Sequence, residues 1–131
     1  MLKKIWILGL FCLPAAAMAD SFWLHNGSVM RLQAEGNARV FSYENPTARM
    51  RGAGVKSGTV LFEGQRRGNR YTGQARVFSS NCGELVYNVS GNVVTERRVV
   101  LTGTREQYNA SCQPTGRFVT DRLVFTYQYS E

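Results

Sequence analysis

The sequence offers little material for a catalytic centre. It contains one histidine, His25, and three cysteines, none of them in a C-x-x-C motif. A hydrolytic serine needs a neighbouring base and a third group that orients the base, and a glycosidase needs two carboxylates flanking a cleft. Structural zinc sites use clusters of cysteine and histidine. We therefore expect a protein that is not an enzyme and that holds no metal or cofactor.

The first 19 residues differ from the rest of the chain. Two lysines precede an apolar run that is too short to span a bilayer, and the segment ends in the small residues Ala17-Met18-Ala19. This order is typical of a secretory signal peptide that is cleaved after Ala19. We therefore predict an exported, periplasmic protein without a membrane span, whose single domain comprises residues 20–131.

Basic residues outnumber acidic ones but form no block. Lys+Arg is 16 and Asp+Glu is 9, and removal of the two leader lysines leaves 14 cations against 9 acids, a net charge of +5. Lys56 is then the only lysine, and the other cations are arginines, whose planar forks suit carboxylates and phosphates. The arginines favour an acidic partner, and the alternative is that they form an ordinary solvated surface. Because they form no basic block, the sequence gives no indication of nucleic-acid binding.

Two cysteines, Cys82 and Cys112, remain after removal of the leader. In an exported chain we expect them to form a disulfide, with a redox or metal role as the less favoured alternative. Closing a loop of about 30 residues contributes roughly 3 to 4 kcal/mol in the chain-entropy model.

Apolar and polar residues alternate through most of the mature chain, and no convincing helical stretch is present. The alternating apolar positions are Met30 and Leu32; Phe41 and Tyr43; Tyr71, Ala75 and Val77; Leu85, Tyr87 and Val89; Val99 and Leu101; and Leu123, Phe125, Tyr127 and Tyr129. Seven or eight such strands, separated by turn residues, predict an all-β fold: a small antiparallel meander barrel, with a sandwich as the alternative. A barrel is preferred because it removes exposed edges, and its interior is filled by side chains or holds one small ligand.

One segment, NPTARMRGAGVKS at residues 45–57, breaks the alternation. Its length and its two glycines predict a mobile loop on one rim of the barrel, and loops of this kind often carry function. The candidate target-binding residues are Lys56, Ser57, Arg49 and Arg51.

The only histidine stands three residues before Ser28 in the segment SFWLHNGSVMRL. Residues three apart on a strand point to opposite faces, so His25 and Ser28 can act as a pair only if Asn26-Gly27 bends the chain. We expect His25 to be structural, hydrogen-bonded near the barrel end that it caps together with Trp23.

The pattern W-x-HNGS-x-M-x-L from Trp23 to Leu32, followed by GT-x-LF-x-G at residues 58–64, resembles a family of small exported alphaproteobacterial proteins. The similarity extends over nearly the whole mature chain. In some members a similar module follows a cysteine-rich domain of the kind found in a lysozyme-inhibitor lipoprotein. The resemblance implies a periplasmic inhibitor whose partner is lysozyme or an endogenous muramidase or lytic transglycosylase. The tyrosine- and tryptophan-bearing motif of C-type lysozyme inhibitors does not align with this sequence.

The residue types of the loop suggest a mechanism of inhibition. A muramidase cleft contains one or two acidic residues that need a sugar between them and water at hand. A cation and a hydroxyl, as in Lys56 and Ser57, would pair with those carboxylates and exclude the glycan. A net charge of +5 repels a basic host lysozyme at long range, so local complementarity must overcome it or the target is a less basic bacterial hydrolase. The alternative function is a non-catalytic envelope-binding barrel that contacts peptidoglycan or lipopolysaccharide.

Overall fold

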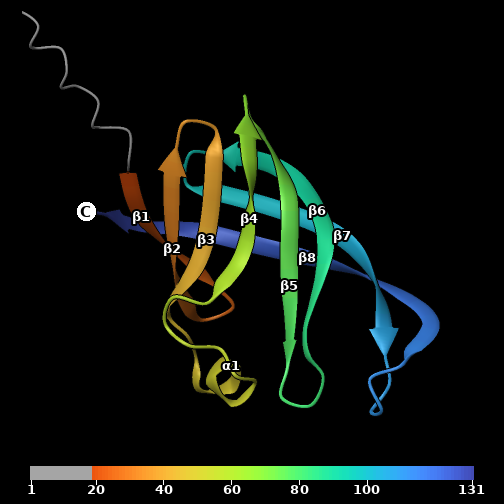
Figure 1. The fold of residues 1–131 in the computed structure, drawn as a ribbon. Coiled ribbons are helices and arrows are strands. Elements are labelled where there is room, and N and C mark those ends of the chain that lie inside the picture. The colour runs from red at the N-terminus through yellow and green to blue at the C-terminus, as the bar shows by residue number, and fades with distance from the viewer. Residues whose placement is uncertain (1–18) are drawn as a thin grey trace, which may run out of the picture.

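The computed structural model describes residues 19–131, which form a closed barrel of eight antiparallel strands in chain order (Figure 1). The predicted signal peptide lies outside the described residues, apart from Ala19 at the start of β1. The strands are β1 (Ala19–His25), β2 (Ser28–Glu35), β3 (Ala38–Asn45), β4 (Val60–Arg67), β5 (Arg70–Ser79), β6 (Gly83–Thr95), β7 (Arg98–Tyr108) and β8 (Pro114–Ser130). Pairing of β1 with β8 closes the barrel, and the predicted all-β meander barrel is confirmed.

Aromatic rings fill the centre of the barrel. Phe41, Phe62, Tyr71 and Phe125 are at most 1% exposed and come from four different strands. Phe41 stacks on Phe125 with 3.9 Å between the ring centroids, and it also packs against the rings of Phe62 and Tyr71. Burial of several large aromatic side chains, each contributing roughly 1.5 to 3 kcal/mol, is the main source of stability for a domain of this size. The centre of the barrel is therefore occupied by side chains.

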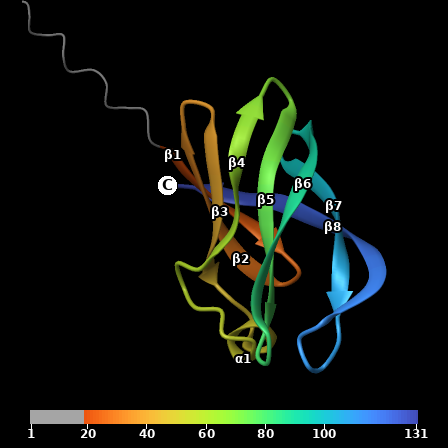
Figure 2. The same cartoon turned by 45° about the vertical axis from the view of Figure 1, so that its right-hand side comes forward.

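Two neighbouring strands, β6 and β7, separate in one half of the barrel (Figure 2). They pair between Ser90–Thr95 and Arg98–Thr102, and no β6–β7 pair among residues 19–131 continues beyond Ser90 and Thr102. From there β6 remains paired only with β5 and β7 only with β8. The facing edges, residues 84–89 and 103–108, are called here the β6–β7 split.

A disulfide closes the far end of the split. Cys82 lies in the turn between β5 and β6 and Cys112 in the turn between β7 and β8, with 5.4 Å between their Cα atoms. One side-chain hydrogen bond, from Asn81 Nδ2 to the carbonyl of Ala110 at 2.9 Å, accompanies it. The predicted disulfide is confirmed, and it joins two hairpin tips that the sheet leaves unpaired.

Removal of the disulfide is expected to lower the free energy of unfolding by about 2 to 5 kcal/mol, as in other small disulfide-bonded domains. The variant is Cys82→Ser with Cys112→Ser, measured by urea denaturation beside the oxidised and the chemically reduced wild type. The reduced wild type should match the variant. An unchanged denaturation midpoint in both would show that the hairpin tips are held together without the covalent bond.

Candidate functional site

Residues 45–59, called here the rim segment, cover one end of the barrel (Figure 1). The segment contains a short helix, α1 (Ala48–Gly52), whose N-cap residue is Thr47. The Thr47 hydroxyl accepts a hydrogen bond from the backbone N–H of Met50 at 3.3 Å, which satisfies one of the free donors at a helix start. The prediction of an irregular loop without helix is therefore wrong for these five residues, because a side-chain cap and local hydrogen bonds organise one helical turn.

The rim segment is attached to the barrel at several points. Val55 is 1% exposed and belongs to the hydrophobic core, and Met50 packs against that core. The backbone N–H of Val55 donates to the Met50 carbonyl at 3.0 Å, and that of Gly58 donates to the Tyr43 carbonyl at 2.7 Å. A segment held by a buried side chain and by backbone hydrogen bonds on both sides presents its exposed residues in a defined arrangement.

The His25–Ser28 segment supports the start of α1. Asn26 and Gly27 have φ values of 48° and 84°, so they form the two-residue turn typical of an Asn-Gly hairpin. Ser28, which is 1% exposed, accepts a hydrogen bond on Oγ from the backbone N–H of Thr47 at 3.1 Å. The turn pairs His25 with Ser28 across the hairpin. The Ser28 hydroxyl, however, bonds to Thr47 and so positions the rim segment.

His25 is buried at the same end of the barrel, with 7% of its surface exposed. Its ring stacks on Phe125, with 4.7 Å between the centroids, and its Nδ1 lies 3.0 Å from the carbonyl oxygen of Val124. A carbonyl only accepts hydrogen bonds, so Nδ1 carries the proton and donates. Burial lowers the pKa of His25, which outweighs the opposite effect of the Val124 hydrogen bond and keeps the ring neutral.

Trp23 precedes His25 by two positions on β1, and its side chain lies inside the barrel. Its ring packs edge-on against Phe41 and Tyr127, and its indole N–H donates to Ser21 Oγ at 2.8 Å. Trp23 borders a cavity at the opposite end of the barrel from α1, whereas His25 borders the one beside α1. The prediction that both residues cap one end is therefore corrected, because Trp23 and His25 are two positions apart along β1, about 6.6 Å, and border different cavities.

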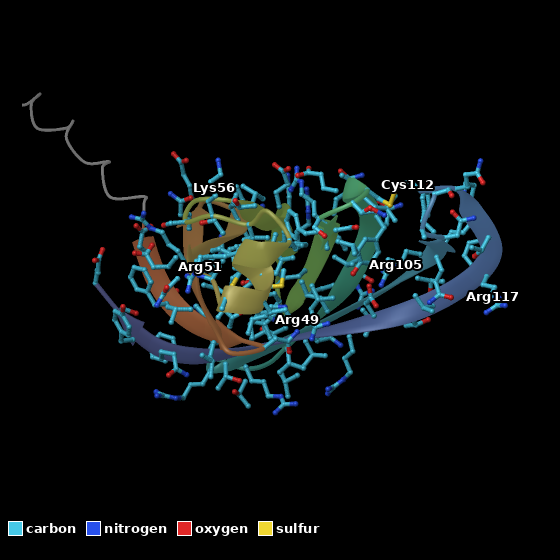
Figure 3. All side chains as sticks on the ribbon, turned by 90° about the horizontal axis from the view of Figure 1, so that it is seen from below. Arg49, Arg51, Lys56, Arg105, Cys112 and Arg117 are labelled. Atoms are coloured by element: carbon cyan, nitrogen blue, oxygen red, sulfur yellow. A yellow bond between two sulfur atoms is a disulfide. The ribbon has the colours of Figure 1, made fainter. Side chains whose placement is uncertain are left out.

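A cavity of about 520 Å³ lies between α1 and strands β5 to β8, and is called here the mouth cavity. Four arginines border it: Arg49 on α1, Arg76 on β5, Arg105 on β7 and Arg122 on β8. Arg76 and Arg122 alternate with the inward residues Ala75 and Leu123, so their side chains point to the outer face of the barrel. Figure 3, which views the α1 end, shows Arg49 beside the helix and Arg105 nearer to the disulfide. The arginines are distant in sequence, and only the closure of the barrel brings them to one site.

Two of these arginines have carboxylate partners. Arg105 Nε donates to Asp121 Oδ2 at 2.6 Å, and the Tyr87 hydroxyl donates to the same oxygen at 2.8 Å. The pKa of Tyr87 is raised, mainly by burial and to a smaller extent by the hydrogen bond to Asp121. The hydroxyl therefore keeps its proton and acts as a donor at neutral pH. Arg76 in turn is paired with two glutamates on neighbouring strands, at 2.7 and 3.1 Å.

The other two arginines of the cavity, Arg49 and Arg122, are exposed and lack such partners. Within residues 19–131, no carboxylate oxygen lies within 4.0 Å of either guanidinium. Arg122 points outward, His25 is neutral and Arg105 is paired with Asp121, so Arg49 is the cation of the described residues that adds an unpaired charge at this cavity.

The structure separates the four predicted target-binding residues into two groups. Arg49 lines the mouth cavity, whereas Arg51, Lys56 and Ser57 line a shallow groove on the outer side of the rim segment. Figure 3 shows Lys56 and Arg51 on the side of α1 away from Arg105. The Arg51 guanidinium donates to the carbonyl of Pro46, so part of its hydrogen-bonding capacity is already used.

Several residues of the site have no signal in the sequence pattern. Arg105 and Asp121 lie on strands far in sequence from the rim segment, and the spacing of Ser28 indicates only a partnership with His25. One indication was available: inward positions of β7 and β8 that continue from Leu101 and Leu123 are polar. That change marks the place where the interior becomes accessible.

No group of three histidine, cysteine, aspartate or glutamate side chains in the described part of the chain is placed to hold a metal ion. In residues 19–131, no helix has the length and apolar character needed to cross a membrane. Comparisons with protein-family models, with curated proteins and with solved structures find no match.

Protonation of His25 is expected to make stability depend on pH. The pKa of His25 is lowered by folding, so the unfolded chain binds the proton more tightly. Stability should therefore be constant above about pH 6.5 and should decrease as the pH falls below it, by at most about 1.4 kcal/mol per pH unit. The measurement is urea denaturation between pH 7.5 and 5.

The matched control is His25→Gln, whose amide can still donate to Val124. Because His25 is the only histidine, this variant should lose most of the slope between pH 6.5 and 5. An identical slope in both proteins would show that another group carries the pH dependence.

Proposed function

We propose that the protein inhibits a peptidoglycan hydrolase of the muramidase type by inserting the outer side of its rim segment into the acidic cleft of the enzyme. The observation that carries this proposal is the combination of exposed Lys56, Ser57 and Arg51 with a backbone that the barrel holds in place. The resemblance of the HNGS pattern to a family of small exported proteins, in some of which the module follows a domain of the lysozyme-inhibitor kind, supports the same function.

The backbone around Lys56 is organised before any partner binds. The N–H of Lys56 donates to the Thr59 hydroxyl at 3.0 Å, and the N–H of Thr59 donates back to the Lys56 carbonyl at 3.0 Å. These reciprocal bonds form a tight turn that leaves the side chains of Lys56 and Ser57 in solvent. Ordering a flexible loop on binding costs free energy, so a turn that is already formed reduces this cost.

The chemistry of the turn is complementary to a muramidase cleft. The Lys56 ammonium can pair with a catalytic carboxylate while the Ser57 hydroxyl donates to a second oxygen. A cation at hydrogen-bond distance lowers the pKa of the general acid, which then cannot protonate the glycosidic oxygen. The same contact occupies the position of the sugar. The enzyme is blocked by loss of both substrate binding and the proton that cleavage requires.

The net charge of the mature chain bears on the choice of target. At +5 the protein is repelled by a strongly basic lysozyme, but this repulsion is screened beyond about 8 Å at physiological salt. Desolvated charge pairs in contact range contribute more than such screened interactions. An endogenous muramidase or lytic transglycosylase of lower charge meets no repulsion and is the favoured target in the periplasm.

The double variant Lys56→Ala with Ser57→Ala should weaken inhibition about tenfold or more, or about 1.4 kcal/mol, with an unchanged circular dichroism spectrum. The measurement is the inhibition constant in a turbidity assay with a basic lysozyme, a bacterial muramidase and a lytic transglycosylase. The matched control is Arg117→Ala, which removes an exposed cation at the far hairpin (Figure 3) and should leave inhibition unchanged.

Two results would contradict the proposal. One is an inhibition constant that does not change even when Arg49 and Arg51 are also replaced. The other is the absence of inhibition of all three enzymes by the wild type. Salt-sensitive binding to purified sacculi without inhibition would instead support the alternative, an envelope-binding barrel.

A further inference from the structure

A second cavity lies at the end of the barrel opposite α1, where β4 ends and β5 begins (Figure 1), and is called here the far cavity. Its volume of about 320 Å³ lies near the lower end of the range of roughly 300 to 1,000 Å³ that is typical of small-ligand sites. Exposed Glu96, Ser130 and Glu131 border it, so it is open to solvent. The rim segment lies at the other end of the barrel, so an inference about the far cavity does not rest on the proposed inhibition.

Two arginines point into the far cavity. Arg39 on β3 lies two positions from the core residue Phe41. Arg66 on β4 follows the core residue Phe62, with Gly64 between them on the same face. Residues two apart on a strand share one face, so both arginines point to the inside of the barrel, and both line the cavity. The pairing of Arg39 with Gly64 places the two guanidiniums on neighbouring strands.

Tyr71 brings a hydroxyl to the same place. It is paired directly with Arg66 across β4 and β5, and it is 1% exposed. Burial raises the pKa of Tyr71, and the charges of Arg39 and Arg66 oppose this effect. Both cations are thus close enough to act on one hydroxyl, which keeps its proton at neutral pH and can donate it to a hydrogen bond.

Each guanidinium keeps N–H groups for a ligand. Arg39 donates from Nη1 to two backbone carbonyls near the β2–β3 turn, which leaves its Nε and Nη2 without an acceptor among residues 19–131. Arg66 donates from Nε and Nη2 to the β4–β5 turn, which leaves its Nη1. The bonds that are made hold both side chains in position. The free fork of Arg39 matches the two oxygens of a carboxylate.

The acids that border the far cavity compete little for these donors. Glu96 lies 3.6 Å from Arg66 Nη2, but its side chain is 80% exposed, so water weakens this pair. Asp20 is held by Arg31, which alternates with the core residues of β2 and so points outward. Glu131 is exposed at the edge. The cations therefore face the inside of the cavity, and the acids lie at its rim.

The rest of the wall is largely apolar. Four buried core residues line the far cavity, and Tyr127 packs edge-on against one of them: Trp23, Leu32, Val93 and Val99. A bare inorganic ion would leave this surface in contact with water, whereas an apolar group would cover it. The aromatic rings that fill the centre of the barrel limit such a group to a compact one. The wall thus favours an acid that carries a small apolar body.

We propose that the far cavity binds a small carboxylic acid with a compact apolar body. Its carboxylate lies on Arg39, Arg66 and the Tyr71 hydroxyl, and its body packs against Trp23 and Val99. Hydrogen bonds from guanidinium to carboxylate are charge-assisted, and they are stronger than those to a neutral oxygen. A neutral amide of the same shape loses this advantage, and a carboxylate without an apolar body leaves the wall uncovered.

The test is isothermal titration calorimetry of the full mature protein at low salt with three probes. Benzoate carries both the carboxylate and the apolar ring, benzamide has the ring without the charge, and acetate has the charge without the ring. Benzoate should bind at least about tenfold more tightly than either of the other two, as expected for loss of a charge-assisted hydrogen bond or of the apolar contact.

Variants locate the site. Arg39→Gln, and independently Arg66→Gln, should weaken binding of benzoate about tenfold. Tyr71→Phe keeps the ring in the core and removes only the hydroxyl, so it should weaken binding less. The matched control is Arg67→Gln, which removes the neighbouring cation on β4; Arg67 is exposed and donates to Gln65, and its loss should not change binding.

Two further variants separate this site from its surroundings. Glu96→Gln removes the acid that competes for Arg66, so it should not weaken binding of benzoate. Lys56→Ala with Ser57→Ala should leave benzoate binding intact, which distinguishes this site from the proposed inhibitory surface. Circular dichroism verifies the fold of each variant.

The proposal is overturned if benzoate does not bind at millimolar concentration, or if benzamide or acetate binds as tightly. It is also overturned if both folded variants, Arg39→Gln and Arg66→Gln, bind benzoate as the wild type does. If either variant fails to fold, amide chemical shifts of the wild type decide. Benzoate should shift the amides of Arg39, Arg66 and Tyr71, and shifts confined to α1 or to the outer face would contradict the proposal.

Discussion

The stacking of Phe41 on Phe125 is the contact on which the rest of the molecule depends. The two rings come from β3 and β8, and their centroids are 3.9 Å apart. The Phe125 ring also packs on His25, which belongs to the hairpin that supports Thr47 through Ser28. Two aromatic contacts and one partly buried hydrogen bond thus connect the rim segment to the core, and a loosened core would release it.

The β6–β7 split explains why a barrel with a filled centre still has an accessible cavity. Above the split, the inward positions of β7 and β8 are apolar, as at Leu101 and Phe125. Along the split, they are occupied by Arg105 and Asp121, which pair with each other and with Tyr87. Charged groups are tolerated there because water has access and each is paired. The Cys82–Cys112 disulfide links the β5–β6 and β7–β8 turns at the end where β6 and β7 are unpaired.

The sequence predicts the barrel well because strand formation leaves a local pattern. Alternation of side chains such as those of Phe41 and Tyr43 follows directly from the two-residue period of a strand, and removal of the predicted signal peptide would leave Cys82 and Cys112 as the two remaining cysteines. Helix α1 is different, since five residues are too few for a helical period to be visible. It is stable because of the Thr47 cap, which is a local contact, and because of the burial of Val55 in the core, which depends on tertiary structure.

The candidate site was predictable only in part. Arg49, Arg51, Lys56 and Ser57 are close in sequence, yet they divide between two surfaces because the helical turn rotates successive side chains away from one another. Arg105 and Asp121 are far from Arg49 in sequence, and only barrel closure brings them to one cavity. Pairings of this kind depend on topology, which single-sequence patterns do not encode.

Amide hydrogen exchange of the rim segment tests most directly whether the barrel presents a preorganised surface. The account predicts that the amides of Arg51, Val55 and Gly58, which donate to the carbonyls of Thr47, Met50 and Tyr43, are protected to a degree that approaches that of the barrel strands. Exchange of these three amides at the rate of an unstructured peptide, in a protein whose strand amides remain protected, would contradict it.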